Sequence, residues 1–288
     1  MITNNNYNES RRKTYQQLTF TDDFMFRKVL MHDADLCRRL VELLLDVEVD
    51  HIAYKDDEHS IATTNEKKSV RLDVYLKDDE GTVFDLEMQN QKDEDLPRRT
   101  RYYQSMLDID HMDSGASYDE LPDSYIVFIC TFDPYGEQLP KYEFRELCKE
   151  DPSIELGSGT AKVFINAKSN SKNVTSEMRA FLDYLCGMDA SSDLTRDIET
   201  GIKRAKANRP WEREYMTLED HLKVQSKRWK EEGRLEGLAE GRAEGESNAR
   251  MDAVSKLIAS GICSTDKACE IIGVSVEDYE EYVKMNKN

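Results

Sequence analysis

Two stretches of alternating sequence decide the fold, since residues 70–76 read Val-Arg-Leu-Asp-Val-Tyr-Leu and residues 82–89 read Thr-Val-Phe-Asp-Leu-Glu-Met-Gln. Apolar side chains at every second position are typical of β-strands that cover a core with one face. The turn between them contains the three-residue loop Asp79-Glu80-Gly81, whose glycine suits the left-handed position of a hairpin with a bulge. We therefore predict an antiparallel hairpin in which residue 78 faces residue 82.

Four polar side chains share one face of this predicted hairpin. Asp73, Asp85, Glu87 and Gln89 have odd numbers, whereas the apolar residues of both strands have even numbers apart from Val83. In the predicted register Asp73 faces Glu87, with Cβ atoms about 5 Å apart. Two carboxylates at that distance repel each other unless they share a proton or bind a cation. The pattern leaves two alternatives, a solvent-exposed face of the hairpin or a site for a divalent cation.

A basic and aromatic segment follows the second strand. Pro97 suits the first turn of a helix that reaches about Ile109, and three arginines and two tyrosines stand near its start. Arginine can contact phosphate groups and tyrosine can stack on bases. We therefore name Arg101 and Tyr103, with Lys68 ahead of the first strand, as candidate DNA-binding residues. The alternative for the tyrosines is a place in the hydrophobic core.

The remaining elements complete a domain that we expect over residues 15–187. Thr21 and two aspartates favour a helix N-terminus, and the nearly wholly apolar residues 125–132 predict a central strand. The expected helices lie at about 23–30, 34–46, 97–109 and 174–186, and the expected strands at 70–76, 82–89, 125–132 and 161–165. This order predicts one α/β domain.

Residues 188–249 have a different composition and predict a charged helical linker. Glycine recurs every four residues, at 233, 237, 241 and 245. One alternative is a solvated, weakly helical segment, because each glycine costs about 1 kcal/mol against alanine. The other is a stripe of small residues that lets two helices approach closely. The second alternative predicts a homo-oligomer held together by the C-terminal helices.

Residues 250–288 predict a small module of three helices, interrupted at Gly261 and Gly273. The spacing is similar to that of a helix-turn-helix. The helix that would enter DNA, residues 276–284, has four acidic residues and one lysine. A phosphate backbone would repel it, so a protein-interaction module is favoured over a DNA reader.

The composition narrows the class of protein. The 288 residues include 58 acidic and 40 basic side chains, for a net charge of −18. A broad basic surface for nucleic acid is therefore disfavoured, whereas a carboxylate site for a divalent cation is allowed. No stretch is apolar enough to span a membrane, residues 1–14 predict a disordered terminus without a secretory signal, and the six separate cysteines favour reduced thiols. We expect a cytoplasmic protein without membrane contact.

Four motifs stand in a characteristic order along the chain. They are Thr-Asp-Asp-Phe-Met-Phe-Arg-Lys-Val-Leu at 21–30, Lys-Lys-Ser-Val-Arg-Leu-Asp-Val at 67–74, Asp-Leu-Glu-Met-Gln at 85–89 and Arg-Tyr-Tyr-Gln-Ser at 101–105. With the Glu-Glu-Gly-Arg type repeat of the tail, they resemble the Rpn family of recombination-promoting nucleases and transposases, in the PD-(D/E)XK nuclease superfamily. The resemblance covers residues 17–245.

This resemblance implies a PD-(D/E)XK-type mixed sheet flanked by helices, followed by a helical C-terminal extension, and Mg²⁺-dependent cleavage of DNA. It assigns Asp73, Glu87 and the backbone carbonyl of Met88 as ligands of Mg²⁺. It assigns Asp23 as an acid that assists the metal through water. Gln89 stands where the wider superfamily has lysine, and it can orient groups by hydrogen bonds without adding positive charge.

Two hypotheses on function follow. The leading one is a Mg²⁺-dependent DNA endonuclease of low sequence specificity, in recombination, mobile-element or defence biology, with Asp23, Asp73, Glu87 and Gln89 as catalytic residues. The alternative is a catalytically weak or inactive protein of nuclease fold that acts through self-association of its helical tail. The missing positive charge would come from Lys67, Lys68 or Arg101, and the sequence leaves this choice open.

Overall fold

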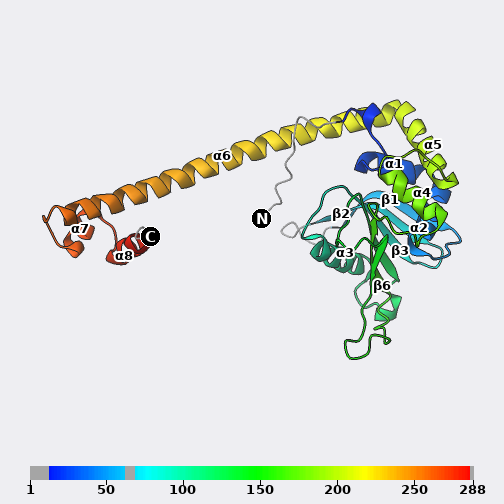
Figure 1. Ribbon diagram of the computed structural model, residues 1–288, viewed down its shortest axis with the longest axis horizontal. Helices are drawn as coiled ribbons and strands as arrows, with labels where there is room; N and C mark the ends of the chain where they lie inside the picture. The colour runs from blue at the N-terminus through cyan, green and yellow to red at the C-terminus, as the bar shows by residue number, and fades with distance from the viewer. Residues whose placement is uncertain (1–12, 62–68, 286–288) are drawn as a thin grey trace. The chain divides into compact units, whose positions relative to one another are not determined.

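The computed structural model describes residues 13–61 and 69–285, which belong to two compact units (Figure 1). The unit that contains the sheet reaches Met216, and the other begins at Thr217. Of residues 1–14, for which the sequence predicts disorder, residues 1–12 lie outside the described residues, as does the candidate residue Lys68. Lys13 and Thr14 are ordered, because Lys13 pairs with Asp22 and Thr14 caps the first turn.

A six-stranded sheet forms the centre of the first unit, counted over the described residues. The pairs β1–β2, β2–β3 and β5–β6 are antiparallel, whereas β3–β4 and β4–β6 are parallel. The predicted mixed sheet is thus confirmed. The strands in spatial order are β1 (Ile52–Ile61), β2 (Val70–Asp78), β3 (Val83–Gln89), β4 (Ser124–Cys130), β6 (Thr160–Asn166) and β5 (Lys141–Phe144).

The β2–β3 hairpin has the register that the alternation and the turn predict. Val74 pairs with Leu86 and Tyr75 with Asp85. At the turn, the backbone N–H of Asp78 donates to the carbonyl of Thr82 at 3.1 Å. Gly81 has a φ of +93°, which an L side chain rarely adopts, so the loop requires glycine here.

Helices lie on both sides of the sheet (Figure 1). Four of them pack against one another, namely α1 (Asp23–His32), α2 (Ala34–Leu45), α4 (Ser176–Leu185) and α5 (Asp193–Ala207). Helix α3 (Leu96–His111) packs with Leu96, Met106 and Leu107 against the core residues Ile126 and Phe128 of β4. Two single turns of 3₁₀ helix, Tyr15–Gln17 and Tyr118–Glu120, complete the unit.

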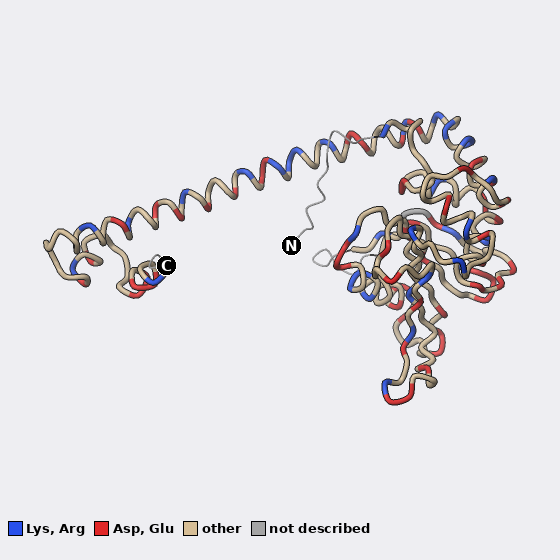
Figure 2. Tube along the Cα trace, viewed as in Figure 1, with Lys and Arg blue, Asp and Glu red and all other residues tan. Residues whose placement is uncertain are grey.

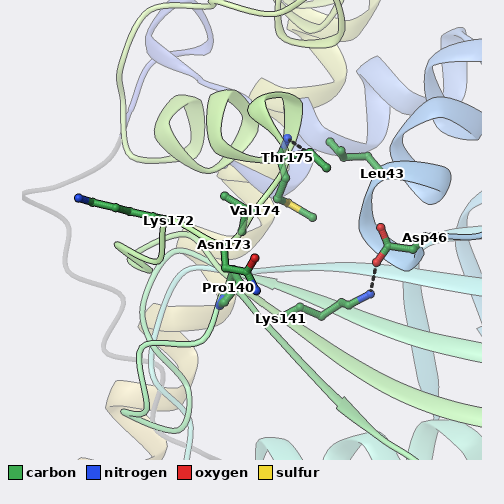
Figure 3. Close-up of a pocket in the computed structure, with 9 residues that line it drawn as sticks. Leu43, Asp46, Pro140, Lys141, Lys172, Asn173, Val174 and Thr175 are labelled. Atoms are coloured by element: carbon green, nitrogen blue, oxygen red, sulfur yellow. Dashed lines mark hydrogen bonds and ion pairs between the residues drawn. The ribbon is translucent and has the colours of Figure 1, made fainter.

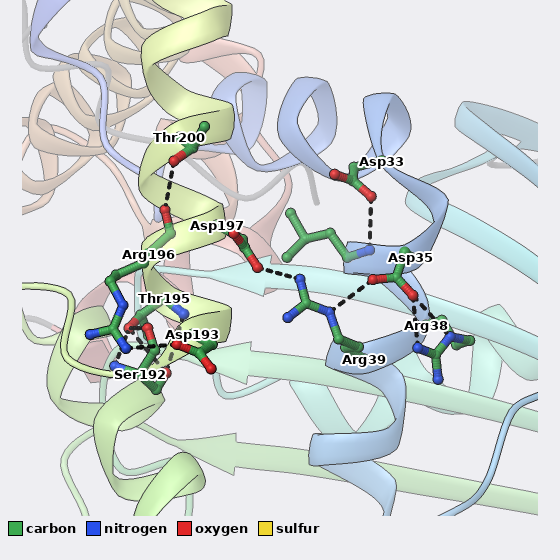
Figure 4. Close-up of polar contacts among 11 residues, drawn as sticks. Asp33, Asp35, Arg38, Arg39, Ser192, Asp193, Thr195, Arg196, Asp197 and Thr200 are labelled. Atoms are coloured by element: carbon green, nitrogen blue, oxygen red, sulfur yellow. Dashed lines mark hydrogen bonds and ion pairs between the residues drawn. The ribbon is translucent and has the colours of Figure 1, made fainter.

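Helix α5 lies beyond residue 187, where the sequence predicts that the domain ends. Its buried side chains recur at helical spacing, with Leu194, Ile198 and Ile202 on one face. Arg39 of α2 also pairs with Asp197 at 2.6 Å, as Figure 4 shows. The charged composition of this segment obscures the apolar face, which packs as part of the first unit.

Two strands, β1 and β5, have no counterpart in the sequence-based prediction. Both are edge strands. Residues 52–61 contain Lys, His and several acids, so they lack the apolar alternation by which a half-buried strand is recognised. Charged residues are common on edges because they oppose pairing with another chain. The short β5 has only four residues.

The second unit consists of helices. Helix α6 (Arg209–Ala259) begins in the first unit and continues into the second, so the predicted linker and the first helix of the predicted module are one helix. Acidic and basic residues alternate along it (Figure 2). Its end packs with α7 (Thr265–Ile272) and α8 (Val276–Met285) around Val254, Ala268, Cys269 and Tyr279. None of the described helices combines the length and apolar composition that a membrane crossing requires.

Candidate functional site

The two carboxylates predicted to face each other are linked through the backbone of the hairpin. The N–H of Asp73 donates to Oε1 of Glu87 at 3.0 Å. In return, the N–H of Met88 donates to Oδ2 of Asp73 at 3.4 Å. The strand register therefore fixes both acids at one place on the sheet.

The acids of β3 on this face of the hairpin are shielded from solvent. Glu87 is 2% exposed and Asp85 is fully buried. The parallel register sets Glu87 beside Phe128 of β4, whose ring belongs to the core that α3 covers. The solvent-exposed alternative is therefore wrong, because a helix that follows the hairpin packs over its polar face.

Burial makes both carboxylates hard to ionise. It raises the pKa of Asp73 to about 6, and the negative charge of Asp23 adds to this effect. It raises the pKa of Glu87 to about 8, with a further contribution from the charge of Asp73. Asp85 has a pKa well above its ordinary range, first through burial and then through the charges of Glu87 and Asp73. A cation would stabilise the ionised forms.

Arg99 of α3 supplies positive charge directly beside these acids. Its Nη2 atom lies 2.7 Å from Oε2 of Glu87, and its Nη1 atom donates to Oε1 of Gln89 at 3.1 Å. Its Nε–H donates to the hydroxyl of Tyr103 at 3.1 Å. The guanidinium also lies 4.9 Å from the ring centre of Phe128. Arg99 therefore has a fixed place in the site.

Gln89 lies at the end of β3 with both ends of its amide engaged. Its Oε1 atom accepts from Arg99, and its Nε2 donates to the carbonyl of Gln91 at 2.7 Å. The side chain is thus oriented by its neighbours, consistent with the expectation that position 89 acts through hydrogen bonds.

Asp23 lies in the first turn of α1, close enough to Asp73 for its charge to influence the pKa of that residue. The position of this turn is set by a contact between the end of β3 and the segment ahead of α1. The side-chain amide of Asn90 donates to the carbonyl of Thr21. The structure therefore brings together Asp23, Asp73, Glu87 and Gln89 from three elements.

The predicted DNA-binding residues differ in their surroundings. Arg101 is exposed on α3. Tyr103 is partly buried, packs against the core and accepts the hydrogen bond from Arg99. The alternative of a place in the hydrophobic core therefore accounts for some of the contacts of this tyrosine. Lys68 lies outside the described residues.

The donor set fits a divalent cation that prefers oxygen ligands. Across residues 13–61 and 69–285, no three histidine, cysteine or acidic side chains are placed to hold one ion together. Mg²⁺ uses one or two carboxylates and keeps several waters, so Asp73 and Glu87 suffice. The oxygens of Asp85 are buried without a hydrogen-bond partner in the described part of the chain, so Arg99 does not satisfy all of the buried acids.

A separate hollow of about 450 Å³ lies away from these acids, between the end of α2 and the start of α4 (Figure 3). Lys141 bridges to Asp46 across it at 2.7 Å, while Lys172 points outward. The hollow contains none of the predicted site residues.

Sequence reasoning did not single out Arg99 among the arginines of this helix. The missed signal is helical spacing. Arg99 follows the buried Leu96 by three residues and precedes Tyr103 by four, so it shares the face that packs on the sheet. Arg98 and Arg101 have other phases and are exposed.

Comparison with known proteins gives a match that spans most of the first unit. A family model described as PD-(D/E)XK nuclease family transposase matches residues 20–199. No curated protein and no solved structure matches the chain. The matched range includes the first helix, the hairpin and α3, which carry the acids and Arg99.

Proposed function

The chain belongs to the PD-(D/E)XK nuclease family transposases, and from this premise we propose that it is a Mg²⁺-dependent phosphodiesterase that cleaves DNA with low sequence specificity. The observation that carries the proposal is the buried pair formed by Asp73 and Glu87, held together by hydrogen bonds across the hairpin. A protein that only binds DNA has no need for two facing acids whose pKa values are raised.

In this proposal Asp73, Glu87 and the backbone carbonyl of Met88 hold the cation. When bound, Mg²⁺ would activate a water molecule and stabilise negative charge on the phosphate. The hairpin presents the two carboxylates from adjacent strands, so little reorganisation is required of them. Asp23 lies at the margin of the pair and would act through water.

DNA is the proposed substrate because the family is one of nucleases and because α3, the helix that carries Arg99, also has an exposed arginine. Arg101 is exposed there and can contact a phosphate group. The excess of acidic residues elsewhere disfavours a long basic contact surface. This favours binding through the bound metal ion and a few contacts to phosphate groups, which do not distinguish one base sequence from another. Cleavage of this kind would serve recombination, mobile-element or defence biology in the cytoplasm.

The proposal is tested by incubating purified full-length protein with supercoiled plasmid. We expect nicking with Mg²⁺ and none after addition of a chelator, with recovery when Mg²⁺ is restored in excess. A chain that leaves plasmid intact under Mg²⁺ and Mn²⁺, while folded by circular dichroism, would contradict the proposal.

A second candidate function is self-association through α6, and a specific observation favours it. Trp229, Leu235 and Leu238 of this helix are about half exposed. The four glycines between residues 233 and 245 leave open space where a side chain would stand, so a second helix could approach closely. We propose that two or more copies of the chain pair along this segment, whether or not the nuclease site is active.

A further inference from the structure

The source of positive charge in the site is open in the sequence, because position 89 is glutamine. Among the described candidates, Arg101 is exposed on α3. Arg99 contacts both Glu87 and Gln89, two residues of the β3 motif that face the site. The charge is therefore available at the end of β3, and it comes from the following helix.

We propose that Arg99 supplies the positive charge that lysine supplies at position 89 in the wider superfamily, and that Gln89 is the positioning residue that holds the guanidinium there. This inference rests on the proposed function. It adds to the site Arg99, a residue that lies outside the four sequence motifs. Arg99 would stabilise negative charge that develops on the phosphate during cleavage.

The surroundings of Arg99 fix the direction of its guanidinium. Tyr103 accepts a hydrogen bond from Nε, and the rings of Tyr103 and Phe128 lie 5.2 Å and 4.9 Å from the central carbon of the group. The guanidinium has five N–H groups, and its contacts with Tyr103, Gln89 and Glu87 use three of them. A charge held in place before the reaction stabilises a transition state better than a mobile one.

Gln89 is suited to this arrangement in a way that lysine is not. Its Oε1 atom accepts a hydrogen bond from Arg99, and the ammonium group of lysine has no acceptor. A lysine at position 89 would also place a second positive charge beside the guanidinium. Glutamine at 89 and arginine at 99 are therefore a matched pair, and we expect changes at the two positions to be strongly coupled.

The test measures cleavage and metal binding for five chains besides the unmodified protein: Arg99→Met, Arg99→Lys, Gln89→Lys, the double variant Gln89→Lys/Arg99→Gln, and the control Arg98→Met. Arg98 lies next in the helix but its side chain is 81% exposed, so its loss removes the same charge outside the site. Plasmid cleavage gives kcat and KM, and calorimetry with Ca²⁺ measures occupation of the carboxylate pair without cleavage.

We expect Arg99→Met to lower kcat by about 100-fold and to leave KM within about threefold. Arg99→Lys should recover part of the loss. Gln89→Lys alone should also lose cleavage, whereas the double variant should regain most of it because one positive charge is restored near its original place. Ca²⁺ affinity should stay equal or rise in Arg99→Met, since the carboxylates remain and a competing cation is gone.

Two outcomes would overturn the inference while the proposed function stands. One is cleavage by Arg99→Met as fast as by Arg98→Met. The other is loss of Ca²⁺ binding together with cleavage in Arg99→Met, which would show that Arg99 only maintains the shape of the site. Absence of cleavage by the unmodified protein would instead refute the proposed function, and this inference with it.

Discussion

The backbone nitrogen of Asp73 lies 3.0 Å from Oε1 of Glu87, so the carboxylate on β3 accepts a hydrogen bond from the backbone of the residue on β2 that carries the other acid. This contact orients Glu87 without neutralising it. Burial and the charge of Asp73 raise the pKa of Glu87 to about 8, although Arg99 pairs with its other oxygen. Arg99 alone thus does not stabilise both carboxylates in their ionised form, and a divalent cation bound to the pair would do so.

Replacement of Asp73 by asparagine should abolish cleavage without unfolding the protein. The variant leaves a metal ion with one acid, and we expect cleavage to fall by about 100-fold or more. The amide oxygen can still accept from the N–H of Met88, while repulsion with Asp23 and Glu87 disappears. The melting temperature without metal should therefore stay equal or rise, as measured by circular dichroism.

Glu80→Gln is the matched control, because it removes a carboxylate from the exposed turn of the same hairpin. It should cleave at the rate of the unmodified protein. If Asp73→Asn cleaved plasmid as fast as Glu80→Gln at equal Mg²⁺, the assignment of the metal ligand would be refuted.

The metal-free protein should lose stability between pH 4.5 and pH 8 because of Glu87. Its pKa rises from 4.5 to about 8 on folding, so the folded chain keeps a proton in this range that the unfolded chain releases. The contribution is fully present below pH 4.5 and is lost as the pH rises through 8. The free energy of unfolding should fall by at most about 1.4 kcal/mol per pH unit from this group.

Urea denaturation in the presence of a chelator measures this effect. Glu87→Gln removes the titrating group, so its stability should decline less over the same pH range than that of the unmodified protein. Mg²⁺ should also reduce the decline, because it binds the ionised form. Parallel pH profiles for Glu87→Gln and the unmodified chain would show that Glu87 has no raised pKa in the folded state.

The hairpin could be predicted from the sequence because its determinants are local. Alternation fixes which side chains share a face, and Gly81 fixes the turn, so the pairing of Tyr75 with Asp85 follows. What covers each face depends on contacts between distant elements. Local alternation does not distinguish a polar face in water from one buried by a helix, and Glu87 is of the second kind.

The partner of Glu87 was hidden for a related reason. Three arginines lie within four residues at the start of α3, and only the rotation of that helix against the sheet decides which one reaches the acids. Arg99 does so because it shares a face with Leu96 and Tyr103. The edge strand β1 escaped prediction because its charged residues break the alternation on which strand assignment depends.

Arg101→Ala should weaken DNA binding without a change in the chemical step. We measure affinity for a short duplex in Ca²⁺ over a range of salt concentrations. Loss of one phosphate contact should reduce the slope of log affinity against log salt by about 1, and kcat at saturating DNA should stay unchanged. Lys172→Ala, which removes an exposed cation from the hollow in Figure 3, is the control and should leave the slope unaltered. Equal slopes for both variants would remove Arg101 from the DNA-binding surface.

Truncation of the chain before Glu231 should lower its mass in solution from that of a dimer or larger assembly to that of a monomer. The cut leaves the first unit whole, because that unit ends at Met216. It removes Leu235 and Leu238, which are 53% and 45% exposed. It also removes the glycine-periodic segment, along which the helices of two copies could pack. Burial of these side chains on a second copy would contribute about 25 cal/mol for each Å² of apolar surface.

Light scattering distinguishes the role of the two leucines from that of chain length. It compares the full chain, the truncated chain and the double variant Leu235→Glu/Leu238→Glu. The double variant keeps every helix and adds two like charges to the segment that truncation removes, so it should behave as the truncated chain does if the leucines hold the copies together. A monomeric full chain would eliminate the assembly altogether. An oligomer that survives truncation would place the contact before Glu231, either in the first unit or in the part of α6 that remains.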